Sequence, residues 1–156
     1  MRLSHRGLYA LKALLVLAEH PPGDLVKIQA ISEQEGIPQK FLESILVVLK
    51  NARLVDSTRG AMGGYRLKRP ADQIHLGEII RIIDGPLAPL GDAAELRRLA
   101  REDPAQPGLF SILLDVRDAA ARILDSTSLA DVLRCTREMV RSREGGGQRR
   151  EGHPEE

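Results

Sequence analysis

Basic residues gather in one short stretch of this 156-residue chain, and their type and spacing suit the binding of an anionic ligand. Six of the 23 Lys and Arg residues lie between Lys50 and Arg69, where Asp56 is the sole acidic residue. The net charge of the whole chain is only +1, so this charge is local. A local basic patch favours contact with a polyanion at one place. A solvated surface is the alternative that charge alone leaves open.

Glycines within the same stretch strengthen the polyanion interpretation. In Arg59-Gly60-Ala61-Met62-Gly63-Gly64 the glycines let the backbone approach a phosphate closely, and Arg59 has the right chemistry to enter a narrow minor groove. Turn geometry by itself also explains these glycines. They do not form a Walker A loop, because no Gly-Lys-Ser/Thr follows, and they do not match Gly-x-Gly-x-x-Gly spacing.

Patterns for catalysis and for metal binding are weak. The four histidines are scattered and lack His-Glu-x-x-His spacing, and no Ser-His-Asp or Cys-His pairing is evident. We therefore expect neither an enzyme nor a bound cofactor. The single cysteine, Cys135, excludes an internal disulfide. It is a candidate redox sensor if Arg134 or Arg137 favours its thiolate, and otherwise a small thiol partly buried in a helix.

Composition excludes several other classes of protein. Hydrophobic residues make up 42% and charged residues 29%, as in an ordinary soluble domain. Aromatic residues are only 3%, with no Trp, which argues against a single-strand binder that stacks bases. Apolar runs are far shorter than a membrane span, and the first residues lack a hydrophobic signal core. We expect a cytoplasmic protein with no membrane partner.

The first half of the chain predicts a helix-turn-helix. A helix over residues 4–20 follows a Ser4 N-cap and ends at Pro21-Pro22-Gly23, with Leu8, Leu11, Leu15 and Ala18 on one stripe and Leu14 beside it. A short helix over 27–35 stops at Gly36, and another over 38–51 starts at Pro38. Two short helices joined by a tight turn are typical of this motif.

Helical periodicity orients the helix over 38–51. Its inward stripe is Leu42, Ile45, Leu46 and Leu49, and its other side carries Lys40, Glu43, Ser44, Val47 and Asn51. An apolar Val47 among polar neighbours suits contact with a thymine methyl in a major groove. A single exposed apolar residue is equally common on ordinary surfaces.

A hairpin follows directly, with strands over 54–58 and 65–67 around the glycine-rich turn, and its position marks it as a wing. A helix over 76–83 completes a first domain over residues 1–85. Residues 86–108 are rich in Pro and Gly and predict a connector outside the core, with a short helix over 92–102.

The remainder predicts two helices and a tail. The helix over 109–124 carries apolar residues on one side, and its alanines permit close approach of a partner helix. A last helix over 129–142 starts at Ser128, with Asp131 as a variant capping box. Residues 143–156 lack apolar residues, and we expect them to be disordered. The predicted fold is mainly α with a small β-hairpin: a winged helix-turn-helix plus a long amphipathic helix.

Several short motifs occur in a specific order along residues 1–140. They are Met1-Arg2-Leu3-Ser4, Gly7-Leu8-Tyr9-Ala10, Ile31-Ser32-Glu33, Gly36-Ile37, Phe41-Leu42-Glu43, Leu54-Val55, Arg59-Gly60, Gly63-Gly64-Tyr65 and Ser128-Leu129-Ala130-Asp131. In their order and spacing together, they resemble the Rrf-two family of winged-helix transcription regulators.

This resemblance implies that the long helix over 109–124 is a dimerisation helix, which crosses its partner in a homodimer. It also implies binding to double-stranded DNA, with a recognition helix in the major groove and a wing in the minor groove. It implies that Gln39, Lys40, Phe41 and Ser44 face bases or phosphates, that Glu43 tunes the accepted sites and that Arg59 is the minor-groove arginine. With the periodicity and charge, the expected DNA-binding set is Gln39, Lys40, Phe41, Glu43, Ser44, Val47, Lys50, Arg59, Gly60, Tyr65 and Arg66. Further phosphate contacts are expected from Arg53, Lys68 and Arg69. The expected dimer interface is Ile112, Val116, Ala119, Ala120 and Ile123.

The connector departs from the family pattern. Members that carry an iron–sulfur cluster hold its cysteines in the segment aligned with residues 86–110, where this chain has neither Cys nor His. The carboxylates there, Asp92, Glu95, Glu102 and Asp103, are hard oxygen ligands that suit a cluster poorly. The resemblance therefore implies a branch of the family without the cluster.

Two functions of different classes follow from the sequence. The first is a sequence-specific regulator, acting as a repressor, whose homodimer binds a palindromic operator. The alternative is a protein-interaction module that uses the winged helix to bind a partner enzyme or regulator, since fold alone does not specify function. A hybrid, in which an unidentified effector or partner protein controls the DNA-binding state, also stays open.

Overall fold

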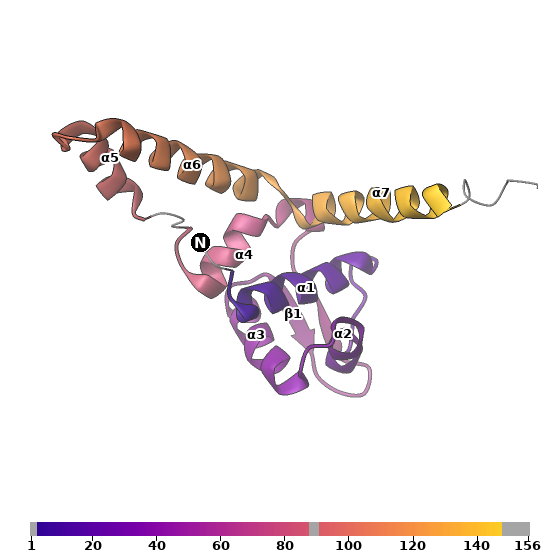
Figure 1. Cartoon of the computed structure of the whole chain (residues 1–156). Helices are drawn as coiled ribbons and strands as arrows, with labels where there is room; N and C mark the ends of the chain where they lie inside the picture. Colours follow the sequence, from indigo (N-terminus) through magenta and orange to yellow (C-terminus); the bar gives the residue numbers. More distant parts are fainter. Residues whose placement is uncertain (1–2, 88–90, 148–156) are drawn as a thin grey trace, which may run out of the picture.

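The computed structural model describes residues 3–87 and 91–147 (Figure 1). Its elements are, in chain order, α1 (His5–Glu19), α2 (Ile28–Glu35), α3 (Gln39–Asn51), β1 (Val55–Thr58), β2 (Gly64–Leu67), the 3-10 helix η1 (Ala71–Gln73), α4 (Leu76–Asp84), α5 (Ala93–Glu102), α6 (Pro107–Ser126) and α7 (Leu129–Gly147). The two strands pair as an antiparallel hairpin. The predicted fold class, mainly helical with a small hairpin, is confirmed.

The winged helix-turn-helix packs around one core at the N-terminal end of the chain. All four residues of the predicted inward stripe of α3, Leu42, Ile45, Leu46 and Leu49, are fully buried. They belong to one buried cluster with Leu14 of α1, Leu54 just before β1 and Ile79 of α4. Their burial confirms the predicted orientation of α3 and leaves its polar face outside.

The predicted stripe of α1 is only partly its buried face. Leu8 is exposed, and Leu11, Leu15 and Ala18 are half-buried against the core. The most buried side of α1 carries Ala10, Ala13, Leu17 and Leu14, the last of which was predicted to lie beside the stripe. The physical reason is that α1 lies between α3 and α4, and small alanines let these helices approach its axis closely. The prediction followed the large leucines and so missed the centre of the buried face, where the small residues Ala10 and Ala13 make the closest contacts.

The turn between α2 and α3 forms as predicted. Gly36 adopts a left-handed conformation with φ of 63°, which glycine reaches without a steric cost. The Ser32 hydroxyl donates to the Ile37 carbonyl at 2.6 Å, and the Ile37 amide donates to the Ser32 carbonyl at 3.1 Å. These two bonds brace the turn and set the angle at which α3 leaves it.

Arg53 ends the turn after α3 in a strained backbone conformation. Its φ is 60°, and it is the sole non-glycine residue with positive φ among those that the structure describes. We expect Arg53→Gly to raise the free energy of unfolding by about 0.5–1 kcal/mol, because the relief of left-handed strain exceeds the entropy cost of glycine. Urea denaturation measures the change. Arg53→Ala keeps the strain, so equal stabilisation by alanine would contradict this explanation.

Helices α5 and α6 form an arm that extends away from the winged helix (Figure 1). The short helix predicted over 92–102 is present as α5 and packs along α6, with Leu96 and the preceding Leu87 buried. Neither leucine belongs to the core cluster of the winged helix, so α5 packs on the arm and not in that core. Prolines and glycines flank α5, which obscured its packing face. Helix α6 spans Pro107–Ser126, longer than the predicted 109–124.

A junction between α4 and the end of α6 attaches this arm to the winged helix. Arg81 donates to both carboxylate oxygens of Asp125, at 2.6 and 2.8 Å, which lowers the pKa of Asp125 and raises that of Arg81. Backbone bonds from Leu76 to the Thr127 carbonyl and from Leu129 to the Ile74 carbonyl, both 2.9 Å, add to the junction. The arm is thus held by paired groups at its base.

Helix α7 begins with the predicted capping box and runs further than predicted. The Ser128 amide donates to Asp131 at 2.9 Å, and the Asp131 amide donates to the Ser128 hydroxyl at 3.1 Å. The helix continues to Gly147, so residues 143–147 of the predicted disordered tail are helical. The rest of that tail, 148–156, lies outside the described residues.

The capping box makes stability depend on acid pH. Hydrogen bonds from Ser128, first from its backbone and then from its side chain, lower the pKa of Asp131 from 3.8 to about 2. A lowered pKa stabilises the fold above the unfolded value of 3.8, and that contribution is lost as pH falls from 3.8 towards 2. We expect Asp131→Asn to lower Tm at pH 6 and to have a much smaller effect at pH 2, as measured by thermal denaturation. An equal effect at both pH values would contradict the role of the carboxylate.

Candidate nucleic-acid interface

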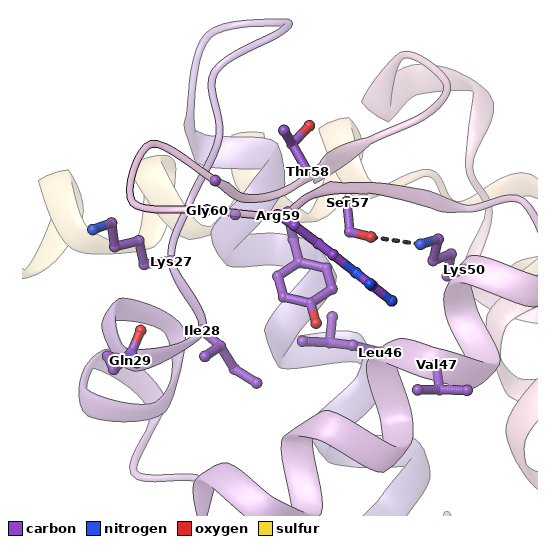
Figure 2. Close-up of a pocket in the computed structure, with 13 residues that line it drawn as sticks. Lys27, Ile28, Gln29, Leu46, Val47, Lys50, Ser57, Thr58, Arg59 and Gly60 are labelled. Carbon is purple, nitrogen blue, oxygen red and sulfur yellow. Dashed lines mark hydrogen bonds between the residues drawn. The ribbon is translucent and has the colours of Figure 1, made fainter.

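An open groove lies between the start of α2, the outward side of α3 and the hairpin (Figure 2). Its volume is about 420 Å³, and polar and apolar residues both line it. The lining residues are Lys27, Ile28, Gln29, Leu46, Val47, Lys50, Ser57, Thr58, Arg59, Gly60, Gly63, Gly64 and Tyr65. Five of the residues predicted to bind DNA are among them: Val47, Lys50, Arg59, Gly60 and Tyr65.

The exposed side of α3 holds the other predicted contacts. Gln39, Lys40, Phe41, Glu43 and Ser44 are all exposed there, and Val47 is 57% exposed. The Gln39 amide donates to Glu43 at 3.5 Å, and the Ser44 hydroxyl donates to the Phe41 carbonyl at 2.8 Å. The structure therefore brings the predicted recognition residues of α3 onto one continuous, solvent-facing side of one helix.

Phe41 has a partner that the sequence did not predict. Its ring meets the edge of Tyr9 on α1, with 5.6 Å between ring centroids and planes at 88°. Edge-to-face pairs of this kind are favourable. The contact holds the Phe41 ring against α1 while leaving it 41% exposed, so it can still touch a ligand on the outer side of α3.

The hairpin keeps its shape because two of its glycines leave no room for a side chain. A Cβ on Gly63 would lie 2.1 Å from the Thr58 carbonyl oxygen, and one on Gly64 would lie 2.6 Å from that of Val26. Val26, just before α2, exchanges two backbone hydrogen bonds of 2.8 Å with Tyr65. The wing is thereby bonded to the segment that leads into the helix-turn-helix.

Cations of the wing and of α3 face each other across the groove. Lys50 on α3 donates to the Ser57 hydroxyl on β1 at 2.7 Å. Figure 2 shows the Arg59 side chain turned back from the hairpin into the groove, towards Leu46 and Val47. Neither cation has a carboxylate within 4.0 Å in the part of the chain that the structure describes. Both are available to an anion.

Three predicted phosphate-binding residues lie elsewhere. The hairpin register pairs Arg66 with Asp56 and alternates it with Tyr65, so Arg66 faces away from the groove and lines a separate cavity with His20 and Pro21. Lys68 pairs with Asp56 at 3.6 Å, and Arg69 pairs with Glu78 at 2.6 Å. The structure does not bring these cations together with the recognition face.

Lys27 and Gln29, at the start of α2, were missed by the sequence analysis. Helices α2 and α3 both begin without a side-chain cap and without an acidic residue in the first turn, whereas Ser4 and Asp92 cap α1 and α5. Uncapped helix N-termini attract anions through their free amides and the helix dipole. The available signal was Lys27 at a position where a capping Ser, Thr, Asp or Asn is normal.

A second exposed surface runs along α6. Ile112, Val116 and Ile123 are 63%, 50% and 62% exposed, and Leu109 extends the row. Ala119 and Ala120 are half-buried beside them. An apolar row of this length on one helix is typical of an interface rather than of a solvated surface. We call these six residues the α6 face.

Possible metal ligands do not assemble. Among residues 3–87 and 91–147, no group of three or more His, Cys, Asp or Glu side chains is placed to hold a metal ion. Cys135 is exposed on α7, and its sulfur lies 3.9 Å from that of Met139. In the same described ranges, no helix combines the length and the apolar character that a bilayer crossing requires.

Comparison with known proteins places these features in a family. The Rrf2 family model (the Rrf-two family above), described as an iron-dependent transcriptional regulator, matches residues 3–135. The HTH-type transcriptional regulator CymR of Bacillus subtilis is 35% identical over 132 residues, which cover 85% of this chain and 89% of CymR.

Solved structures agree with this assignment. The structure of B. subtilis CymR, titled as the global cysteine regulator, superposes with a TM-score of 0.73 at 31% identity, covering 85% of this chain and 95% of CymR. That of T. potens IscR gives 0.68 at 32% identity, covering 89% and 90%. A match over 133 residues by the family model, together with these relatives, shows that the chain belongs to the Rrf2 family of transcriptional regulators, which are DNA-binding proteins and not enzymes.

Proposed function

We propose that the chain is a homodimeric repressor that binds a palindromic operator through α3 and the wing. Each subunit places α3 in a major groove, with half-site centres about one helical turn apart. Gln39, Glu43 and Val47 contact base edges, whereas Lys40, Ser44 and Phe41 contact bases or the adjacent backbone. Lys50, Gly60 and Tyr65 flank the wing-side phosphates.

The observation that carries this proposal is the cationic groove between α3 and the hairpin. Lys27, Lys50 and Arg59 line it together with the uncapped start of α2, so cations and free amides surround a space open to one side. Phosphates are the ligand chemistry that such a combination favours.

Dimerisation through the α6 face supplies the second half-site. The row from Leu109 to Ile123 is apolar, and its alanines allow two copies of α6 to cross closely. In a symmetric homodimer, the α6 face of each copy covers the α6 face of the other. This contact aligns two recognition helices without requiring any further subunit.

We further propose that this protein regulates without an iron–sulfur cluster. The family description names iron, but the donors do not fit a cluster: residues 86–110 contain no Cys or His, and Cys135 lies on α7, outside that segment. Carboxylates such as Asp92, which caps α5, are hard ligands already used in local hydrogen bonds. Cys135 stays a candidate redox residue, tested by whether thiol alkylation changes operator affinity.

Selection of binding sites from fragmented genomic DNA, at two salt concentrations, tests the proposal. We expect an enriched palindrome whose affinity falls steeply with salt, because binding releases counterions from the phosphates. No enrichment at low salt, combined with capture of a partner by the winged helix that withstands high salt, would instead support the protein-interaction module.

Arg59→Ala tests the wing. We expect a loss of roughly 1–3 kcal/mol in specific binding, with relaxed preference at the base pairs under the wing, because Arg59 lies in the groove. Electrophoretic mobility shifts with the selected duplex measure it. Arg97→Ala, which removes an exposed arginine on α5, is the matched control. Unchanged operator binding by Arg59→Ala would rule out the wing assignment.

A further inference from the structure

The tip of the wing carries an apolar side chain that no other residue covers. Met62 is 90% exposed, the highest exposure of any large apolar side chain in the described part of the chain. The next most exposed belong to the α6 face, which has an interface to explain it. Met62 is instead alone, at the end of a hairpin that already flanks the candidate DNA-binding groove.

Backbone geometry leaves few positions at this tip for a side chain. Gly63 and Gly64 face carbonyl oxygens that exclude a Cβ, and Gly60 has a φ of 104°, where other residues are strained. Ala61 and Met62 remain. Since Arg59 turns back into the groove (Figure 2), the longest side chain at the tip is the Met62 thioether and not a cation.

The surroundings of Met62 determine which partner it meets. The turn from Arg59 to Gly64 contains no carboxylate, and Lys27, Lys50 and Arg59 line the adjacent groove. Gly60 and Gly63 of the same turn line that groove, so a polyanion bound there lies next to the hairpin tip that carries Met62. Apolar side chains, Met among them, enter the minor groove as wedges between base pairs.

We propose that Met62 is such a wedge: it inserts from the minor-groove side at one base step in each half-site and partly unstacks it. This inference rests on the proposed DNA binding of the winged helix. The unbranched thioether adapts its shape to the step it enters. Pyrimidine–purine steps such as TA and CA unstack most easily, so Met62 selects sites by deformability at a position that no hydrogen bond reads.

The test uses the full-length protein and the duplex selected above, with 2-aminopurine placed at the step under the wing. Unstacking raises the fluorescence of this base. We expect the wild-type protein and Met62→Leu to raise it, whereas Met62→Ala lowers the rise by more than half and weakens specific binding about tenfold. Met139→Ala removes an exposed methionine from α7 and serves as the matched control, with no change expected.

A second arm replaces the TA or CA step under the wing with a stiff AA step. We expect this change to weaken wild-type binding about tenfold and Met62→Ala binding little, because the variant has no wedge to insert. If Met62→Ala keeps wild-type affinity, fluorescence and step preference on a duplex that the wild-type protein selects, the wedge is overturned and the proposed function stands. If the wild-type protein selects no duplex, that result contradicts both the wedge and the proposed function.

Discussion

Ile123→Asp is expected to separate the proposed homodimer into monomers and to lower the affinity for the proposed palindromic operator by about 100-fold or more. Ile123 lies 62% exposed on the α6 face, and a carboxylate there would have to be buried against a second copy of the same apolar row. Each monomer would then hold a single half-site. Loss of the linked second contact removes a factor of 10² to 10⁴ in avidity. Sedimentation velocity gives the oligomeric state and mobility shifts give the affinity.

The control for this variant is Arg122→Asp, on the same turn of α6. Arg122 is exposed and lies outside the apolar row, so its reversal changes charge without burying a carboxylate. We expect it to stay dimeric. An Ile123→Asp protein that remains a dimer, or that binds the palindrome as the wild type does, would show that the α6 face is not the interface. Circular dichroism checks that both variants fold.

Gly63→Ala is expected to disrupt the wing while leaving the helical core folded. The new Cβ would lie 2.1 Å from the Thr58 carbonyl oxygen, which belongs to the backbone and cannot move aside like a flexible side chain. The turn must open, at a cost of about 1–3 kcal/mol, typical of overpacking. We expect specific DNA affinity to fall about 10- to 100-fold, since Arg59 and the β2 contacts lose their placement.

Ala61→Gly is the matched control for Gly63→Ala, because it changes the same turn without adding an atom. Urea denaturation and mobility shifts on both variants separate the effects. We expect Ala61→Gly to bind the operator with an affinity near that of the wild type. Full retention of operator binding by Gly63→Ala would show that the tight turn, and with it the wing, does not contribute to recognition.

Much of the candidate site was predictable because its signals are local. Gly36 marks a left-handed turn, and the periodicity from Leu42 to Leu49 orients α3, since a side chain's place on a helix depends only on its position in the chain. The same local logic predicted the capping box of α7 and the hairpin around Gly63. Boundaries were less accurate: α6 and α7 each extend beyond the predicted ends.

The sequence by itself determined which residues face out of α3, where the wing turns and which helix carries an uncovered apolar row. Periodicity, capping and turn chemistry involve residues a few positions apart, so they can be recognised from the amino-acid sequence alone. Only the tertiary structure decided which face of α1 is buried, that α5 packs on α6 and that Arg66 and Arg69 turn away from the groove. These outcomes depend on contacts between residues that are not local in the sequence, such as the ion pair of Arg69 with Glu78. Such contacts form only when the folded chain brings the two residues together.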